Sequence, residues 1–348
     1  KGGKRERKGS TDSANGARAA KRKRNEVTFV GLDGEGVDRD DGAHDYNLLS
    51  VGEESLHHPD GRRLTTDEIF TFLWEQHDPK KVYVGFFLGY DFSQWLRDLP
   101  EDRAAMLLTK EGQAARRRND SNGNTTPFPV GWGRWEFDLL PNMKRFKLRP
   151  QGSKVPWLYV CDAGPLYQCS FENAISPDDW PAGTQVCTAE EFKVIRTGKA
   201  ARGDGATVPR GTPVDPETIR YNLLENELLS RLMDRTNEGL VNMDVKLKKT
   251  QWFGPGQAAQ AWMRNEAAAH TGEACRDAAP AEAFDAARMS YFGGWFEIMA
   301  HGPVYGTTYE YDINSAYPHI IAGLPCLLHG TWTHGEGAPP RRKSPWRL

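Results

Sequence analysis

The residues best suited to chemistry in this sequence are carboxylates at the ends of apolar runs. Asp33 and Glu35 directly follow the apolar residues 27–32 and are separated by one position. On an extended backbone, both side chains leave the same face of the strand. Two such carboxylates repel each other unless a cation neutralises them, and their oxygens suit Mg²⁺ or Mn²⁺. The pair therefore predicts a divalent-metal site.

Three residues further along the chain are candidates to complete that site. Asp91 follows a β-type run and opens a helical pattern, where a carboxylate either binds metal or caps the helix. Tyr221 and Glu225 stand four positions apart in a long helical pattern and so share one face, as a functional pair or as a solvated one. Such a set of carboxylates can hold two cations about 3.5–4 Å apart, which activate a water and stabilise the leaving oxygen in phosphodiester hydrolysis.

A separate acidic motif, Tyr-Asp-Ile-Asn-Ser-Ala-Tyr-Pro, covers residues 311–318. Its Asp312 ends a β-type run ahead of a turn, and a carboxylate beneath backbone amides can seat a divalent cation and a triphosphate. Upstream, residues 291–294 read Tyr-Phe-Gly-Gly. Paired glycines let backbone amides approach phosphates, although a plain turn has the same composition. Together the two motifs indicate nucleotide or nucleic-acid chemistry.

Alternating strands and helices must position these residues. We expect helices that begin near Thr66, begin near Asp91 and cover residues 216–237, and strands at residues 27–32, 45–51, 81–87 and 157–161. Residues 196–216 are rich in Gly, Pro and Arg and predict a loop. The alternation indicates an α/β fold for the first two-thirds of the chain.

Composition sets the remaining limits. The 348 residues are 38% hydrophobic with a net charge of −2, which suits a packed protein without a uniformly basic surface. Ten basic and two acidic residues fall within residues 1–25, which we expect to be a disordered cationic arm, either phosphate-binding or merely solvated. The five cysteines form no C-x-x-C pair, which favours a reducing compartment. No apolar run is long enough for a membrane span.

The order of these motifs resembles that of the family B DNA polymerases, most closely the phage and protein-primed branch. The resemblance implies a ribonuclease H-like 3′→5′ exonuclease domain, an α/β fold, in which two Mg²⁺ or Mn²⁺ ions are bound by Asp33, Glu35, Asp91 and Glu225. Tyr221 would orient the attacking water or the scissile phosphate. Two positions differ from the family, because its Asn four residues before Asp91 is Phe87 here and its last Asp is Glu225.

The same resemblance identifies residues 309–320 as motif A of a polymerase palm. Catalytic metals would be bound there by Asp312 and the carbonyl of Ile313. The incoming dNTP would contact Ser315, Ala316 and Tyr317, and template DNA would contact Tyr291, Gly293 and Gly294. The second acidic turn of a palm does not follow Asp312, so we expect nucleotide addition to need sequence beyond residue 348.

The resemblance implies four parts: the disordered basic arm (1–25), the exonuclease domain (26–237), a helical connector (238–290) and the truncated start of a palm (291–348). The implied protein is a DNA-directed DNA polymerase, present here as an N-terminal fragment able to perform only the exonuclease step. Its implied partners are DNA (a single-stranded 3′ end or a primer–template), dNTP in the full-length protein and a terminal protein primer, without a membrane. The implied location is the cytoplasm of a bacterium or phage-infected cell, as a soluble protein.

Two other functions remain open from the sequence. A stand-alone ribonuclease H-like exonuclease would keep the same carboxylates and use the C-terminal region as a binding extension. A non-catalytic module would bind single-stranded nucleic acid through the basic arm, the arginines at 116–118 and aromatic residues such as Trp132 and Trp135. The departures from the family at Phe87 and Glu225 favour this last interpretation.

Overall fold

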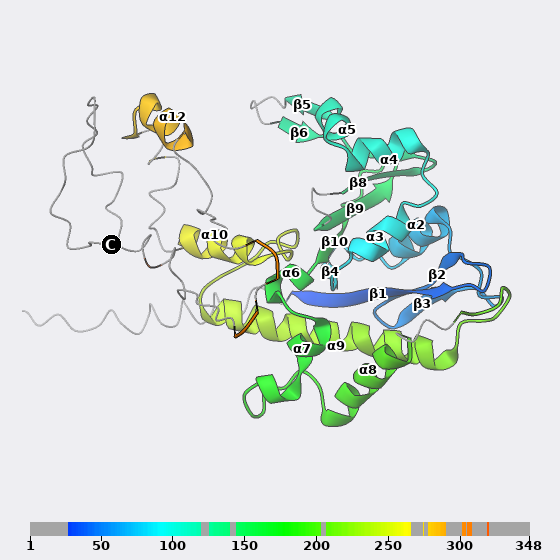
Figure 1. Cartoon of the computed structure of the whole chain (residues 1–348). Helices are drawn as coiled ribbons and strands as arrows, with labels where there is room; N and C mark the ends of the chain where they lie inside the picture. Colours follow the sequence, from blue (N-terminus) through cyan, green and yellow to red (C-terminus); the bar gives the residue numbers. More distant parts are fainter. Residues whose placement is uncertain are drawn as a thin grey trace, which may run out of the picture. The chain divides into compact units, whose positions relative to one another are not determined.

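The apolar run before Asp33 forms a strand, and the strand continues through the acidic motif. In the computed structural model of the protein, β1 spans Thr28–Asp38 and lies inside an eight-stranded sheet (Figure 1). Side chains alternate between the two faces of a strand, so Asp33 and Glu35 share the face of β1 that also carries Phe29. The extended strand therefore presents both carboxylates to the same side of the sheet.

The structure describes residues 27–119, 125–139, 144–202, 207–265, 274, 278–289, 301–303, 305–307 and 319, and the chain divides into two units, Lys1–Trp262 and Met263–Leu348. The second unit is described mainly by one helix, α12 (Ala281–Met289). Outside the described residues lie the basic arm and the predicted linker and palm residues Tyr291, Gly293, Gly294, Asp312, Ile313, Ser315, Ala316 and Tyr317.

The sheet of the first unit combines parallel and antiparallel pairs in the order β3-β2-β1-β4-β10-β9-β8-β7. β1 pairs antiparallel with β2 and parallel with β4, and β4 pairs parallel with β10. The other strands of this sheet are β2 (His44–Val51), β3 (Glu54–His57), β4 (Lys81–Gly85), β10 (Leu158–Asp162), β9 (Arg145–Pro150), β8 (Trp135–Leu139) and β7 (Val130–Trp132). This mixed sheet and its connecting helices confirm the α/β class.

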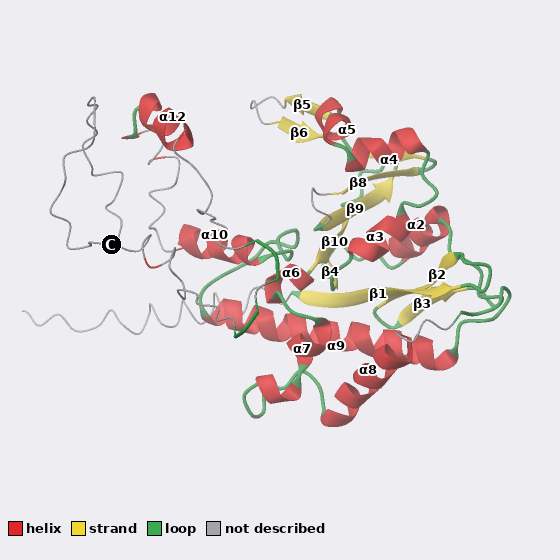
Figure 2. Ribbon diagram, in the orientation of Figure 1, coloured by secondary structure: helices red, strands yellow, loops and turns green. Residues whose placement is uncertain are grey.

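Helices connect the strands and cover the sheet (Figure 2). They are α2 (Thr66–Glu75), α3 (Gly89–Trp95), α4 (Glu101–Leu108), α5 (Lys110–Ala115), α6 (Gly164–Tyr167), α7 (Phe171–Ile175), the short 3₁₀ helix η1 (Pro177–Asp179), α8 (Ala189–Arg202), α9 (Pro216–Asn242) and α10 (Pro255–Asn265). A separate antiparallel pair, β5 (Arg117–Asn119) and β6 (Thr125–Pro127), follows α5. The helix α2 begins at Thr66, as expected. The residue before it, Thr65, caps the helix, because its side chain accepts a hydrogen bond from the Glu68 N–H.

Two apolar cores lie on opposite faces of the sheet, as the alternation along β4 shows. Tyr83 packs with Phe70 and other residues of α2, α3 and β9, whereas Val82 and Val84 pack with residues of α7, α8 and α9. α9 runs along β1 on one face, while α2 and α3 lie on the other (Figure 1). Because Asp33 and Glu35 point to the face with Phe29, a member of the second core, they point toward α9.

The helix α9 is longer than the sequence predicts and crosses the expected boundary at residue 237. It begins with Pro216 in its first turn, as predicted, and ends at Asn242. The chain then contributes Val245 and Leu247 to the second core, and Trp252, fully buried, packs edge-on against Phe29 with ring centroids 4.8 Å apart. The first unit accordingly extends to Trp262.

The prediction of a loop at residues 196–216 is wrong for its first residues, because α8 continues to Arg202. Gly198, a residue of low helix propensity, lies within this helix and receives the ring of Tyr221 from α9. A Cβ at position 198 would lie 2.2 Å from that ring. Packing between the two helices thus overrides the local glycine signal.

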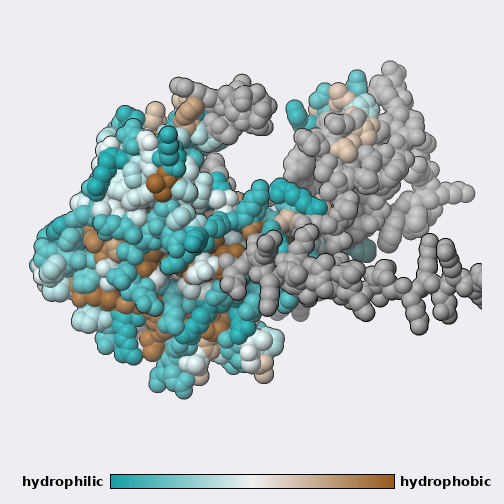
Figure 3. Space-filling model, turned by 180° about the vertical axis from the view of Figure 1, so that it is seen from behind, coloured by the Kyte–Doolittle hydropathy of each residue, from teal (hydrophilic) through white to brown (hydrophobic). Residues whose placement is uncertain are grey.

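The surface of the first unit is largely hydrophilic on the face opposite to that of Figure 1, with apolar side chains in patches (Figure 3). Within the part of the chain that the structure describes, none of the helices is both long enough and apolar enough to cross a membrane.

Candidate metal centre

A glycine lets α9 approach the strand that carries the acidic motif. A Cβ at Gly31 would lie 2.2 Å from the backbone oxygen of Asn226 on α9, so a larger residue would push the helix away. The Gly31 N–H donates to Ser230 Oγ at 2.8 Å, and Ser230 in turn donates to the Asn226 carbonyl at 2.9 Å. These contacts hold α9 close to β1 at Gly31, two residues before Asp33.

This approach brings three of the predicted carboxylates together. Asp33 and Glu35 of β1 and Glu225 of α9 each offer one oxygen, and these oxygens all lie within 4.8 Å of one another. All three residues are half-buried, so solvent reaches the cluster although α9 covers this face of the sheet. The arrangement joins residues that are almost two hundred positions apart in the sequence, and only helix packing decides this.

The electrostatics of the cluster fit a divalent cation. Burial raises the pKa of Asp33 well above its ordinary value, and the neighbouring carboxylates of Glu225 and Glu35 raise it further. A bound cation would relieve this repulsion, and carboxylate oxygens are the ligands that Mg²⁺ and Mn²⁺ prefer. The residues present therefore match the chemistry of a divalent-metal site.

Asp91 lies beside this cluster in the first turn of α3 and is 4% exposed. Its Oδ1 accepts a hydrogen bond of 2.9 Å from the Tyr46 hydroxyl, which itself accepts from Trp95 Nε1 at 3.0 Å. Burial raises the pKa of Asp91 to about 7, the Tyr46 hydrogen bond opposes the rise, and the charge of Glu35 adds to it. Asp91 is thus a buried carboxylate in electrostatic contact with the cluster.

Two residues that the sequence analysis missed hold these carboxylates in place. Asn222 donates from Nδ2 to Oδ2 of Asp33 at 3.0 Å, and Tyr46 holds Asp91 as described above. Asn222 stands three positions before Glu225 and so shares its helix face, which is a signal that the sequence does contain. Tyr46 carries no such signal, because an aromatic residue in a strand is typical of a core position.

Tyr221 occupies a different environment from the other predicted site residues. It lies one helical turn before Glu225, but its side chain is buried in the second core and its ring rests on Gly198 of α8. Its role in orienting a water or a phosphate stays a prediction.

Phe87 stands between β4 and α3 in a left-handed conformation, with φ of 59°, and its side chain is half exposed. A non-glycine residue in this region costs about 1–3 kcal/mol and needs support from its surroundings. Asp162 supplies it, because its Oδ1 accepts from the N–H of Phe87 at 2.8 Å and of Gly164 at 3.0 Å. Asp162 therefore stabilises the backbone of this turn.

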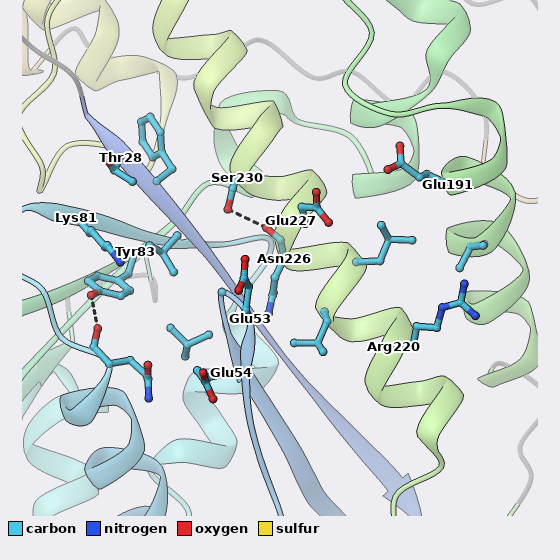
Figure 4. A pocket seen from close by; sticks show the side chains of 18 of the residues that line it. Thr28, Glu53, Glu54, Lys81, Tyr83, Glu191, Arg220, Asn226, Glu227 and Ser230 are labelled. Atoms are coloured by element: carbon cyan, nitrogen blue, oxygen red, sulfur yellow. Dashed lines mark hydrogen bonds between the residues drawn. The ribbon is translucent and has the colours of Figure 1, made fainter.

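A cavity of about 940 Å³ lies elsewhere on the first unit. Figure 4 shows Thr28, Glu54, Lys81 and Tyr83 from the strands, Glu53 from the β2–β3 turn, and Arg220 and Glu227 from α9 around it. None of the predicted exonuclease residues lines this cavity, which adjoins the beginning of β1 rather than the carboxylates. It is therefore separate from the candidate metal centre.

Comparisons with known proteins do not identify a family for this chain. No protein-family model matches the sequence, and no curated protein does so either. Among solved structures, the exonuclease (EXO) domain of Nibbler from Aedes aegypti is similar over 73% of this chain and 92% of that domain, with 11% sequence identity and a TM-score of 0.31. A likeness of this size defines neither the fold nor the activity of the chain.

Proposed function

We propose that this chain is a metal-dependent nuclease of the ribonuclease H-like class that removes nucleotides from the 3′ end of a DNA strand. The proposal rests on one observation: the carboxylates of Asp33, Glu35 and Glu225 lie close together, and the buried Asp91 lies beside them. Nearby carboxylates that raise one another's pKa are typical of functional sites. The 3′→5′ direction and the choice of DNA come from the sequence resemblance alone.

The chain's own residues would bind and orient the metals and the substrate. Asp33, Glu35, Glu225 and Asp91 would hold two Mg²⁺ or Mn²⁺ ions, whose chemistry is the activation of a water and the stabilisation of the leaving oxygen. Asn222 would keep Asp33 in one rotamer, and the Tyr46 hydroxyl would do the same for Asp91. Tyr221 would orient the water or the phosphate, as the resemblance implies.

The polymerase part of the resemblance is a further proposal that rests on the sequence motif around Asp312 alone. In a longer protein, Asp312 and Ile313 would bind metal, and the remaining palm residues would contact dNTP and template DNA. A terminal protein primer belongs to this same proposal. We expect no primer extension by this chain alone, because one acidic motif cannot hold the two ions that nucleotide transfer requires.

The test is the shortening of a 5′-labelled single strand of DNA with Mg²⁺ or Mn²⁺. We expect a ladder of products that shorten from the 3′ end, and we expect Asp33→Asn to abolish it. The matched control is Asp40→Asn, an exposed carboxylate in the turn after β1. If the wild-type chain binds the strand but leaves it intact with either ion at high enzyme concentration, the chain is a binding module and the nuclease proposal is wrong.

A further inference from the structure

Three side chains at the edge of the carboxylate cluster form a hydrogen-bonded chain that the nuclease proposal does not use. His44 Nδ1 lies 2.7 Å from Asp38 Oδ1, and His44 Nε2 lies 2.6 Å from the hydroxyl of Tyr90. The chain reaches solvent, since the side chains of His44 and Asp38 are 40% and 63% exposed and Tyr90 is 39% exposed. We call it the Asp38–His44–Tyr90 chain.

The Tyr90 end of this chain lies next to the candidate metal centre. Tyr90 directly precedes Asp91, and its ring packs against Tyr46, the residue that binds Asp91, with centroids 5.8 Å apart. Its hydroxyl lies over Gly36, which directly follows Glu35. A Cβ at Gly36 would stand 2.0 Å from the Tyr90 hydroxyl oxygen and 2.5 Å from His44 Nε2. Glycine at this position is therefore required for the chain to form.

When the His44 imidazole is neutral, its two partners fix which groups donate. The Asp38 carboxylate only accepts, so His44 Nδ1 carries a proton and donates it. A neutral imidazole then accepts at Nε2, and the Tyr90 hydroxyl donates to it. With that proton committed to His44, the phenolic oxygen presents only its lone pairs to the surroundings.

We propose that the Tyr90 oxygen accepts a hydrogen bond from a sugar hydroxyl of the terminal nucleotide, with His44 and Asp38 as positioning residues. The proposal rests on the nuclease function above, since it places the strand end beside the carboxylates. Phosphate oxygens accept and do not donate, so they find no partner in an oxygen that only accepts. A sugar hydroxyl donates, whether it is the 3′-hydroxyl of any strand end or the 2′-hydroxyl of a ribonucleotide.

The experiment compares three otherwise identical single strands, ending in a 3′-hydroxyl deoxynucleotide, a 2′,3′-dideoxynucleotide or a 3′-deoxyribonucleotide with a 2′-hydroxyl. Removal of the terminal nucleotide is measured with Mn²⁺ at about pH 8. One neutral hydrogen bond predicts that the wild type cleaves a hydroxyl-bearing end about fivefold faster in kcat/KM than the dideoxy end. The hydroxyl that produces the preference, 3′ or 2′, identifies the one that Tyr90 binds.

Substitutions then assign the preference to the proposed residues. Tyr90→Phe keeps the ring and should reduce the ratio between hydroxyl and dideoxy ends to about one. His44→Ala should reduce the ratio in part, because the hydroxyl loses its fixed orientation. Tyr159→Phe, at a half-buried tyrosine of β10, is the matched control and should leave the ratio unchanged. A Tyr90→Phe variant that retains the wild-type ratio would overturn the proposal.

A second measurement separates this proposal from the nuclease function. Binding of the same three strands is followed by fluorescence anisotropy with Ca²⁺ in place of the catalytic ion. One outcome is that no strand is cleaved, that hydroxyl ends bind more tightly than the dideoxy end, and that Tyr90→Phe removes this difference. The sugar-binding proposal is then confirmed and the nuclease proposal is wrong. If strands are cleaved at equal rates and bound equally, the nuclease function stands and the sugar-binding site is wrong.

Discussion

Asn222 on α9 donates a 3.0 Å hydrogen bond to the Asp33 carboxylate on β1, across 189 positions of sequence. The bond supplies a donor to a carboxylate whose other close neighbours include Glu225 and Glu35, both negative. It therefore does two things at once. It ties the long helix to the central strand, and it holds a candidate metal ligand in one orientation while the charges around it oppose ionisation.

Replacing Asn222 should affect both stability and metal binding. We expect Asn222→Ala to lower the free energy of unfolding by about 1 kcal/mol, the usual size of one hydrogen bond, and to weaken Mn²⁺ binding about tenfold or more. Urea unfolding and isothermal titration calorimetry with Mn²⁺ measure the two effects. Asn237→Ala, on the same helix, is the control. Unchanged Mn²⁺ affinity in Asn222→Ala would show that Asn222 does not orient a ligand.

Glu225→Gln should separate metal binding from folding. Loss of a ligand carboxylate should weaken Mn²⁺ binding by at least about tenfold, the lower bound for losing even an outer-shell partner. The metal-free protein should become more stable at neutral pH, because one source of repulsion on Asp33 is gone. A gain of about 1 kcal/mol would raise Tm by about 2–4 °C in a unit of this size.

The matched control for Glu225→Gln is Glu238→Gln, which removes an exposed carboxylate from the same helix. Glu238 pairs with Arg235 at 2.9 Å near the surface, and such pairs contribute little to stability. Both Mn²⁺ affinity and Tm should stay close to wild type. If the Tm of metal-free Glu225→Gln is lower than that of the wild type while the Tm of Glu238→Gln is unchanged, Glu225 does not destabilise the protein by repelling Asp33.

The stability of the metal-free protein should depend on pH through Asp91. The pKa of Asp91 rises from its ordinary 3.8 to about 7 on folding, so the folded state binds more protons than the unfolded chain between these values. The free energy of unfolding therefore falls as pH rises across this window, and Asp33, whose pKa is also raised, adds to the fall. Mg²⁺ should restore the loss, because it binds the ionised carboxylates.

Thermal unfolding in EDTA and in Mg²⁺, at several pH values across this window, measures the effect. The Tm difference between the two conditions should grow as pH increases, and Asp91→Asn should reduce the growth. A constant difference across the whole window would show that these carboxylates do not bind the ion.

Residues beyond 237 should be essential to the first unit. Trp252→Ala removes a fully buried ring that packs against Phe29 at the beginning of β1, and we expect it to cost about 3–5 kcal/mol. Trp262→Ala, at a side chain that is 49% exposed, is the control and should be close to neutral. Denaturant unfolding of both variants gives the comparison. Equal stability of the two would mean that the unit ends earlier, near residue 237.

The sequence by itself determined the α/β class and the acidic candidates. The motif around Asp33 and Glu35 follows from strand alternation, and Asp91 and Glu225 follow from their places in helical patterns. These are local features, decided by residues within a few positions. The same local reasoning failed at Gly198, because contact with Tyr221 keeps α8 intact where the sequence indicates a loop.

The tertiary structure decided which candidates meet and what holds them. Glu225 reaches Asp33 because Gly31 admits the backbone of α9, a contact between residues far apart in the sequence that no local pattern encodes. Tyr46, Asn222 and His44 gain their roles only from partners on other elements. Hydrogen bonds and charge repulsion act over a few ångströms of space, so their energies depend on packing and not on sequence spacing.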